Sequence, residues 1–353
     1  MTRPGHTGYE LQRPRRPLRR AVRAAVLALT FAIAACGGQG EGDVVRVRVP
    51  AGSSFSAVTD SLAENEITRA PARFRTYARI KGADHDIPPG TYGFRKGTGW
   101  GRVLDDLREG RVMTVKLVIP EGWDLRKIAP RLAALTGLPE DSVFTVLADT
   151  TLVEKYGLPG PTLEGYLYPA TYIFPLDSPL EPVLDRLIRE YKARWTPARQ
   201  ARADSIGMSE REVVTLASIV EKEAKVRDEM PMIAAVYHNR LRIGYPLQAD
   251  PTVQYALGEH QSRLLYAHID SVADTPYNPY RHPGLPPGPI ASPSVAALDA
   301  TLYPADTKYL YFVARPDGTH IFSRSLAEHN RAKALIRRGR TVSGAGAANP
   351  GED

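Results

Sequence analysis

One carboxylate, Glu221, stands at the end of an apolar helical pattern, where an acid would lie at the edge of a protein core. Ser209 and Glu212 have the spacing of a capping box at the start of this helix. The apolar residues that then recur at helical spacing are Val213, Ala217, Val220 and Ala224. Partial burial favours the neutral form of a carboxyl group, and a general acid must hold a proton at the working pH. The pattern therefore indicates an acid catalyst at Glu221, with ordinary flank charges at Glu221 and Glu223 as the alternative.

Four segments follow this helix in order, and with Leu216–Ala224 they resemble the catalytic domain of the endolytic murein (peptidoglycan) transglycosylases. They are Val236–Leu241, Leu247–Tyr255, Tyr277–Tyr280 and Gly284–Pro293. The resemblance extends from about Glu164 to Asn330. It implies non-hydrolytic cleavage of the β-1,4 bond between N-acetylmuramic acid and N-acetylglucosamine inside glycan strands, which leaves a 1,6-anhydro end and limits strand length. It also implies that Glu221 is the catalytic acid.

The remaining candidate residues have side chains that could bind a saccharide. Amide and carboxylate groups can hydrogen-bond to sugar hydroxyls, and aromatic faces can pack on sugar rings. The predicted substrate-binding residues are Gln248, Asp250, Tyr255, Tyr277, Asn278, Glu164, Glu223 and His320. Asp250 and Pro251 could instead only begin a helix at Thr252.

Two of these predictions have open alternatives. Glu164 begins a Tyr-rich segment, Glu164–Tyr172, that also resembles the family, although Ala170 stands where the family commonly has Asp. Glu164 could cap a helix or form a salt bridge rather than contact substrate. His320 falls in a predicted hairpin, followed by a helix from about Leu326, and could pack within the fold.

The carboxylate spacing favours one acid over a pair. A hydrolytic glycosidase needs two facing carboxylates, and Glu221 and Glu223 point roughly 200° apart on a helix. A second acid would have to come from Asp250 or Glu164, so a muramidase-type hydrolase stays open. A non-catalytic peptidoglycan-binding scaffold is the alternative from another class.

An internal repeat marks the N-terminal third. Val47–Phe55 aligns with Leu117–Leu125 at an offset of 70, and each segment predicts a strand, a turn and an amphipathic helix. Further predicted elements are a helix near 71–81, a strand at 90–94 and a helix near 100–107. The first repeat resembles a LysM module, which implies binding of N-acetylglucosamine polymers; a purely structural unit is the alternative.

The first residues resemble an export leader. Residues 1–35 hold seven arginines and one acid, a charge of +6, and the remainder has 39 basic and 38 acidic residues, a charge of +1. Most of the net charge of +7 therefore belongs to the leader and gives no argument for nucleic acid. The uncharged run Ala24–Ala35 is shorter than the roughly 20 residues of a membrane span. It ends at Cys36 in a pattern that resembles a bacterial lipobox, which implies lipidation of Cys36; an uncleaved short span is the alternative.

We therefore expect an α+β protein with a LysM-like α/β module or modules, followed by a mixed, mainly helical catalytic domain with a C-terminal β-hairpin and helix. The expected parts are a leader or anchor (1–36), a flexible tether (37–43), the LysM-like module (44–113), the second repeat unit (114–150), the catalytic domain (151–340) and a disordered tail (341–353). Either anchor places the catalytic domain on the outer side of the cytoplasmic membrane, facing the periplasm and cell wall. The resemblance implies peptidoglycan strands as substrate and peptidoglycan synthases as partners. The scattered histidines predict no metal, and no cofactor is expected.

Overall fold

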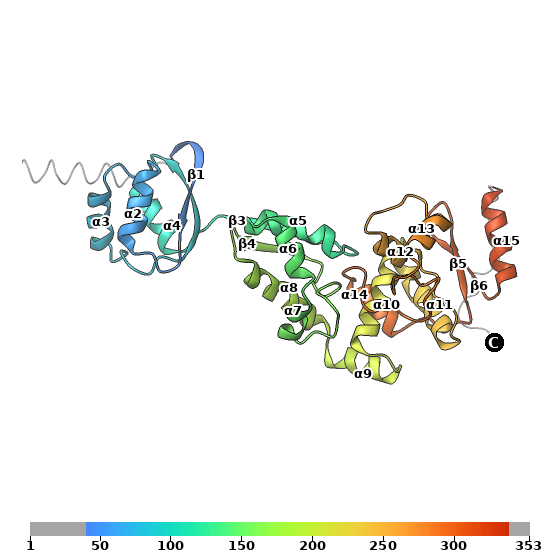
Figure 1. Cartoon of the computed structure of the whole chain (residues 1–353). Helices are drawn as coiled ribbons and strands as arrows, with labels where there is room; N and C mark the ends of the chain where they lie inside the picture. The colour runs from blue at the N-terminus through green and yellow to red at the C-terminus, as the bar shows by residue number, and fades with distance from the viewer. Residues whose placement is uncertain (1–39, 339–353) are drawn as a thin grey trace, which may run out of the picture. The chain divides into compact units, whose positions relative to one another are not determined.

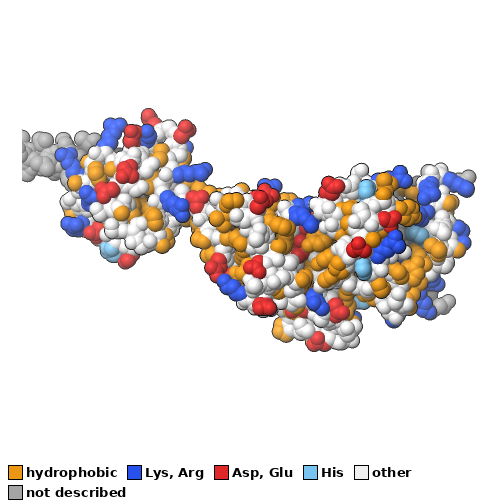
Figure 2. All heavy atoms as spheres, in the orientation of Figure 1, with side chains coloured by type: hydrophobic (Ala, Val, Ile, Leu, Met, Phe, Trp, Pro, Cys, Tyr) orange, Lys and Arg blue, Asp and Glu red, His pale blue; other side chains and the backbone are white. Residues whose placement is uncertain are grey.

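The computed structural model describes residues 40–338, which divide after Thr114 into two units (Figure 1). The predicted leader, the lipidation site at Cys36 and the predicted tail 341–353 lie outside the described residues. Among residues 40–338, no helix is both long and apolar enough to cross a membrane. On the face visible in Figure 2, basic and acidic side chains are interspersed.

The first unit contains a two-stranded antiparallel sheet and three helices. Its elements are β1 (Glu41–Val49), α2 (Phe55–Glu64), α3 (Pro71–Ile80), β2 (Gly90–Lys96) and α4 (Trp100–Arg108). Ser54 caps α2 and Pro71 begins α3, as the fixed φ angle of proline favours. Inward-facing residues of the strands, such as Val47 and Tyr92, pack against Leu62 and Phe74 in one core. The predicted elements of this third of the chain are confirmed.

The predicted flexible tether, 37–43, is wrong at its last three residues. Glu41 already pairs with Lys96, and β1 passes through an irregularity before Val44. The Arg95 side chain donates to the Gly42 carbonyl, which holds this stretch against β2. Glycines usually weaken a strand, but here the paired partner strand outweighs their flexibility.

The second unit begins with the second repeat and continues as a mainly helical body. Its elements up to the central helix are β3 (Thr114–Val118), α5 (Leu125–Thr136), α6 (Glu140–Leu147), α7 (Thr150–Tyr156), β4 (Thr171–Pro175), α8 (Leu180–Arg194) and α9 (Pro197–Ser205). The strand β3 pairs with β4, so the repeat is completed by a strand from a later segment. Residues of α5 such as Ile128 and Leu132 share one core with residues after position 150.

Around the central helix lie the elements that position the candidate acids. They are α10 (Glu210–Glu223), η1 (Arg227–Glu229), α11 (Met230–Arg242), α12 (Asp250–Leu257), α13 (Tyr266–Ser271), α14 (Val295–Leu302), β5 (Tyr311–Ala314), β6 (His320–Ser323) and α15 (Leu326–Arg337). Helices α10, α11 and α14 pack against one another, and β5 and β6 form the predicted hairpin, followed by the predicted helix α15. The mixed α+β class is confirmed.

The helix α10 differs from its sequence pattern in one respect. The Ser209–Glu212 capping box is formed as predicted. Its residues from Val213 to Val220 are all buried, however, so the helix has no solvent-facing side in its middle. The sequence pattern indicated one apolar side, but α11 and α14 also cover sides of α10 that the pattern left exposed to solvent. The polar side chains of Thr215 and Ser218 are therefore buried as well.

A proline-rich segment, residues 284–294, connects the loop after α13 to α14 without regular structure. Missing N–H groups at prolines prevent a helix interior or central strand here. The Ile290 N–H donates to Ser218 Oγ of α10 over 3.0 Å, so a buried helix hydroxyl fixes the middle of the segment. We call residues 284–294 the proline loop.

Candidate active site

Glu221 lies in the last turn of α10 and is half-buried. Its Oε2 accepts two hydrogen bonds from Ser294, one from the backbone N–H at 3.0 Å and one from the hydroxyl at 2.6 Å. Ser294 is also the N-cap residue of α14, where its hydroxyl oxygen accepts from the Ala297 N–H. Both Ser294 bonds go to the same carboxylate oxygen, so Oε1 is the oxygen that would carry an acid proton.

A glycine turn from the second repeat approaches the same carboxylate. Gly122 has a φ of +72°, and a Cβ built on it would lie 3.5 Å from Glu221 Cγ. Its N–H donates to the Ser292 carbonyl at 2.8 Å, and the Ser292 N–H donates to the Trp123 carbonyl at 2.8 Å. Lys222 Nζ donates to the Gly122 carbonyl at 3.2 Å. Glu221 therefore sits where α10, this turn and the proline loop meet.

Glu164 is a buried acid whose side chain contacts the first residue of α5. Its Oε2 accepts from the Leu125 N–H at 3.1 Å, and only 2% of the residue is exposed. The pKa of Glu164 is raised to about 8, mainly by burial and also by nearby Asp124, while the Leu125 N–H and the Tyr255 hydroxyl oppose the shift. Glu164 is therefore protonated at neutral pH. The helix-capping alternative from the sequence matches this contact.

Two predicted aromatic residues lie beside Glu164. The rings of Tyr255 and Tyr277 are 5.1 Å apart at their centroids, and both residues are half-buried. The Arg126 guanidinium lies 5.1 Å above the Tyr255 ring and donates to the Tyr255 carbonyl at 3.0 Å. Burial is the main cause that raises the pKa of Tyr277 to about 12, and the Glu164 carboxyl adds to it. These contacts bring together three predicted binding residues from separate parts of the chain.

The raised pKa of Glu164 predicts a pH-dependent stability. In the unfolded chain this carboxyl ionises above about pH 4.5, whereas in the fold it keeps its proton up to about pH 8. Between these values the folded state binds more protons, so the stability falls as pH rises, by up to about 1.4 kcal/mol per pH unit from this group. Glu164→Gln removes the titration and keeps an acceptor for the Leu125 N–H. We expect the variant to gain stability relative to wild type from pH 5 to pH 8 and not beyond.

Urea denaturation of both proteins at pH 5, 6.5 and 8 measures this difference. The other shifted acids are present in both proteins and cancel in the comparison. A difference between variant and wild type that does not change with pH would show that Glu164 is ionised in the fold.

Glu223 and Asp250 form a second group of carboxylates. Tyr237 donates its hydroxyl to Glu223 Oε1 at 2.8 Å, and Tyr280 donates to Asp250 Oδ1 at 2.6 Å. Burial raises the pKa of Glu223 to about 7; the Tyr237 bond opposes this, and Asp250 lies close enough to raise it further. Asp250 is exposed in the first turn of α12, which begins at Asp250 itself rather than at Thr252, and the helix-start alternative matches this place.

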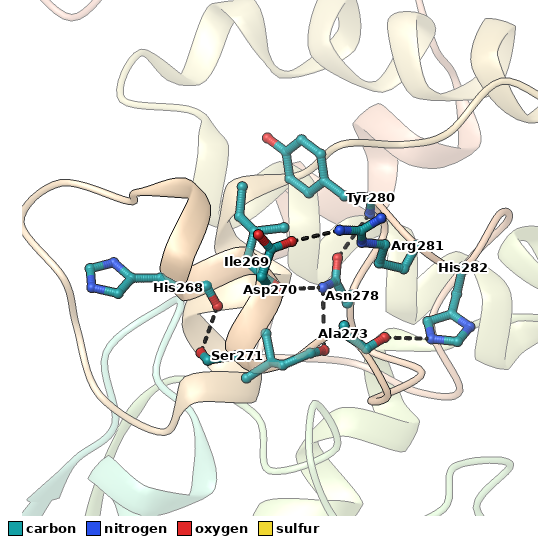
Figure 3. Close-up of polar contacts among 10 residues, drawn as sticks. His268, Ile269, Asp270, Ser271, Ala273, Asn278, Tyr280, Arg281 and His282 are labelled. Carbon is teal, nitrogen blue, oxygen red and sulfur yellow. Dashed lines mark hydrogen bonds and ion pairs between the residues drawn. The ribbon is translucent and has the colours of Figure 1, made fainter.

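The loop after α13 encloses Asn278, which is fully buried (Figure 3). Its Nδ2 donates to the Ile269 carbonyl at 2.7 Å and to the Val272 carbonyl at 3.2 Å, and its Oδ1 accepts from the Tyr280 N–H at 3.1 Å. The side chain thereby braces the loop that carries Tyr280. Direct sugar contact by Asn278 stays a prediction, and the contacts in Figure 3 give it a positioning role.

Gln248 and His320 have different surroundings. Gln248 is exposed, has a φ of +47°, and its N–H donates to the Pro279 carbonyl at 3.4 Å, which ties it to the loop of Asn278. His320 is 6% exposed and packs in the hairpin edge-on to Phe312. Its N–H and its Nδ1 contact the two carboxylate oxygens of Glu229 at 3.0 and 2.7 Å. The packing alternative for His320 matches this environment.

Three residues at the site were missed by the sequence reasoning. Ser294 precedes an apolar helical run, which is an N-cap signal, but nothing local connects it with Glu221. Gly122 lies in the second repeat and Lys222 lies in the family motif Leu216–Ala224, but neither pattern places them beside Glu221. Among residues 40–338, no three His, Cys, Asp or Glu side chains come together to hold a metal ion.

The fold and site define a class: a mixed α+β protein whose central helix ends at a half-buried acid, Glu221, held by Ser294. The chain belongs to the YceG-like family, whose model matches residues 47–335. A Bacillus subtilis protein named endolytic murein transglycosylase is 33% identical over 305 residues, which cover 82% of this chain and 84% of the relative. A Streptococcus pneumoniae protein of the same name is 28% identical over 317 residues; the match covers 81% of this chain and 57% of that longer protein.

A solved structure has the same architecture. The crystal structure of a YceG-like protein from Listeria monocytogenes matches with a TM-score of 0.57 and 33% sequence identity, and the match covers 83% of this chain and all of that one. The family resemblance inferred from the motifs is therefore confirmed.

Proposed function

We propose that this protein is an endolytic peptidoglycan lytic transglycosylase, a lyase that cuts glycan strands internally without water. The observation that carries the proposal is the family membership over residues 47–335, together with relatives named for this activity. The position of Glu221 in a half-buried site is what the reaction requires of its acid.

In the proposed reaction, Glu221 acts twice. Its Oε1 proton passes to the glycosidic oxygen of N-acetylglucosamine while the bond from that oxygen to the anomeric carbon of N-acetylmuramic acid breaks. The resulting carboxylate then takes the proton of the muramic 6-hydroxyl as O6 bonds to the same anomeric carbon. The acid ends as it began, protonated, and no water is consumed. Ser294 would hold Oε2 throughout and so orient Oε1.

The surroundings of the other acids favour this one-acid reaction over hydrolysis. A hydrolase needs a second carboxylate across the sugar, about 5–5.5 Å or ~6.5–9.5 Å from the first. Glu164 is protonated at neutral pH and buried at a helix start, so it is a poor base there. Asp250 is exposed, accepts a hydrogen bond from Tyr280 and lies near Glu223, whose side chain leaves α10 roughly 160° away from that of Glu221.

The mass of the products tests the function. We expect purified peptidoglycan, digested by the full chain, to release muropeptides with anhydro ends, one water lighter than muramidase products. Mass spectrometry of the released fragments distinguishes the two. Fragments with reducing ends would make the protein a hydrolase, and no release of fragments would favour a binding scaffold.

The N-terminal parts complete the proposal. The order of β1, α2, α3 and β2 supports a LysM-like module that binds N-acetylglucosamine polymers in the first unit. A lipid on Cys36, or a short membrane span, would anchor the chain at the cytoplasmic membrane with the catalytic unit facing the cell wall. Peptidoglycan synthases at the same membrane are the partners we propose.

A further inference from the structure

A depression in the second unit lies along α10, toward the N-terminal end of that helix. It has a volume of about 820 Å³, within the range of ligand-binding clefts. Its walls come from the α9–α10 connection, α10, α11 and the first part of the proline loop. The lining residues are Ile206, Gly207, Met208, Arg211, Glu212, Thr215, His238, Leu241, Arg242, Gly284, Leu285, Pro286 and Pro287. We call this depression the arginine pocket.

The polar groups of the arginine pocket favour a ligand with a negative charge. Arg211 and Arg242 contribute two guanidinium groups, and Arg242 uses one N–H to bond Asn239 Oδ1 at 2.8 Å. The lining carboxylate, Glu212, is engaged in the capping box, where its Oε2 accepts from the N–H and the hydroxyl of Ser209. His238 adds no charge at neutral pH, because burial and the nearby arginines lower its pKa.

One lining group is built to receive a hydrogen bond. Thr215 is 1% exposed, and its Oγ1 has no hydrogen-bond partner among the described residues. Leaving a buried hydroxyl unpaired costs about 1–3 kcal/mol, so a ligand group that bonds to it would recover that energy. The rest of the lining is apolar, from Met208, Leu241 and Leu285. The pocket thus combines aliphatic contact with two cations and one unpaired hydroxyl.

The proline loop connects the arginine pocket with Glu221. Thr215, Ser218 and Glu221 follow one another at three-residue steps along α10. The proline loop lines the pocket beside Thr215 and donates its Ile290 N–H to Ser218. It also donates the N–H and the hydroxyl of Ser294 to Glu221. Glu221 comes six positions after Thr215 in the helix, which is about 9 Å along the axis.

We propose that the arginine pocket binds the acidic stem peptide carried by a muramic acid near the scissile bond. This rests on the proposed function, since the peptide is part of the peptidoglycan substrate. Such a peptide has short aliphatic residues and free carboxylates, which match the apolar walls and the two arginines. Four extended residues reach up to about 14 Å, which exceeds the roughly 9 Å between Thr215 and Glu221 along the axis of α10.

The test compares two glycan substrates with the double variant Arg211→Ala/Arg242→Ala in the full chain. Losing charged hydrogen bonds to carboxylates should lower kcat/KM on peptide-bearing strands about ten-fold more than on strands stripped of peptides by an amidase. The control double variant Arg186→Ala/Arg337→Ala removes two exposed arginines of α8 and α15 and should keep the wild-type ratio. An equal change on both substrates overturns the proposal.

A binding measurement separates this inference from the proposed function. Calorimetric titration with a synthetic L-alanyl-γ-D-glutamyl tetrapeptide should show saturable binding to the wild type, about ten-fold weaker in the arginine double variant. Absence of binding to the wild type, or equal binding to both proteins, contradicts the inference even if strands are cleaved. Binding without any strand cleavage keeps the pocket assignment and overturns the proposed function instead.

Discussion

Replacing Glu221 by glutamine should reduce glycan cleavage by about 10²–10⁴-fold while leaving the fold intact, since general acid–base catalysis contributes that much. The amide keeps the shape of the side chain and can still accept the two Ser294 hydrogen bonds through its oxygen. It cannot pass a proton to the glycosidic oxygen or take one from the 6-hydroxyl. Release of anhydro-muropeptides over time, with circular dichroism of both proteins, measures activity and folding separately.

Glu223→Gln is the matched control on the same helix. It removes an acid two residues away whose pKa is raised to about 7, while its oxygen can still accept from Tyr237. We expect a loss far smaller than for Glu221→Gln, with its effect largest where Glu223 would ionise. Equal losses would mean that both carboxylates carry protons in the reaction, and an active Glu221→Gln protein would refute the assignment of the acid.

The second large effect is expected on stability, from Gly165→Ala. Gly165 has a φ of +83°, and a Cβ there would lie 2.5 Å from Pro289 Cβ and 3.3 Å from Val214 Cγ1. The left-handed backbone costs an alanine about 1–2 kcal/mol and overpacking adds about 1–3, so a loss of about 2–5 kcal/mol follows. Activity should fall as well, because Pro289 belongs to the loop that ends at Ser294.

Gly137→Ala separates the two causes. Gly137 ends α5 with a φ of +73°, and among the described residues no heavy atom lies within 4 Å of the place its new methyl group would take, so only the backbone cost applies. Urea denaturation should give a loss of about 1–2 kcal/mol there. If both variants lose the same amount, the proline loop yields to the new methyl group and the contact with Pro289 is not tight.

Local chemistry explains what the sequence could predict. The capping box of α10 and the hairpin depend on neighbouring residues, and both are found. The contact between Glu221 and Ser294 joins residues 73 apart, and that between Glu164 and Leu125 joins residues 39 apart. No spacing rule predicts such pairs, because they depend on how whole elements pack.

Burial was the quantity that the pattern predicted least well. Periodicity indicated a helix with one apolar side, yet the middle of α10 is covered all round, which accounts for the buried Thr215 and Ser218. The proposal that Glu221 is the catalytic acid came from the family motif, whereas its hydrogen-bond partner Ser294 came only from the fold. Asn278 had the right chemistry for a sugar contact, but its amide is bonded to the end of α13 and to the loop that follows it.

The burial of α10 from Val213 to Val220 also affects how often this helix opens locally. A helix with eight consecutive buried residues and a closed capping box belongs to the last part of a protein to open in native-state hydrogen exchange. Glu221 comes directly after that run, at the point where the helix leaves the core. Glu221 thus lies at the end of a helix that should open slowly. We expect its position relative to the core to persist while the surrounding loops open locally.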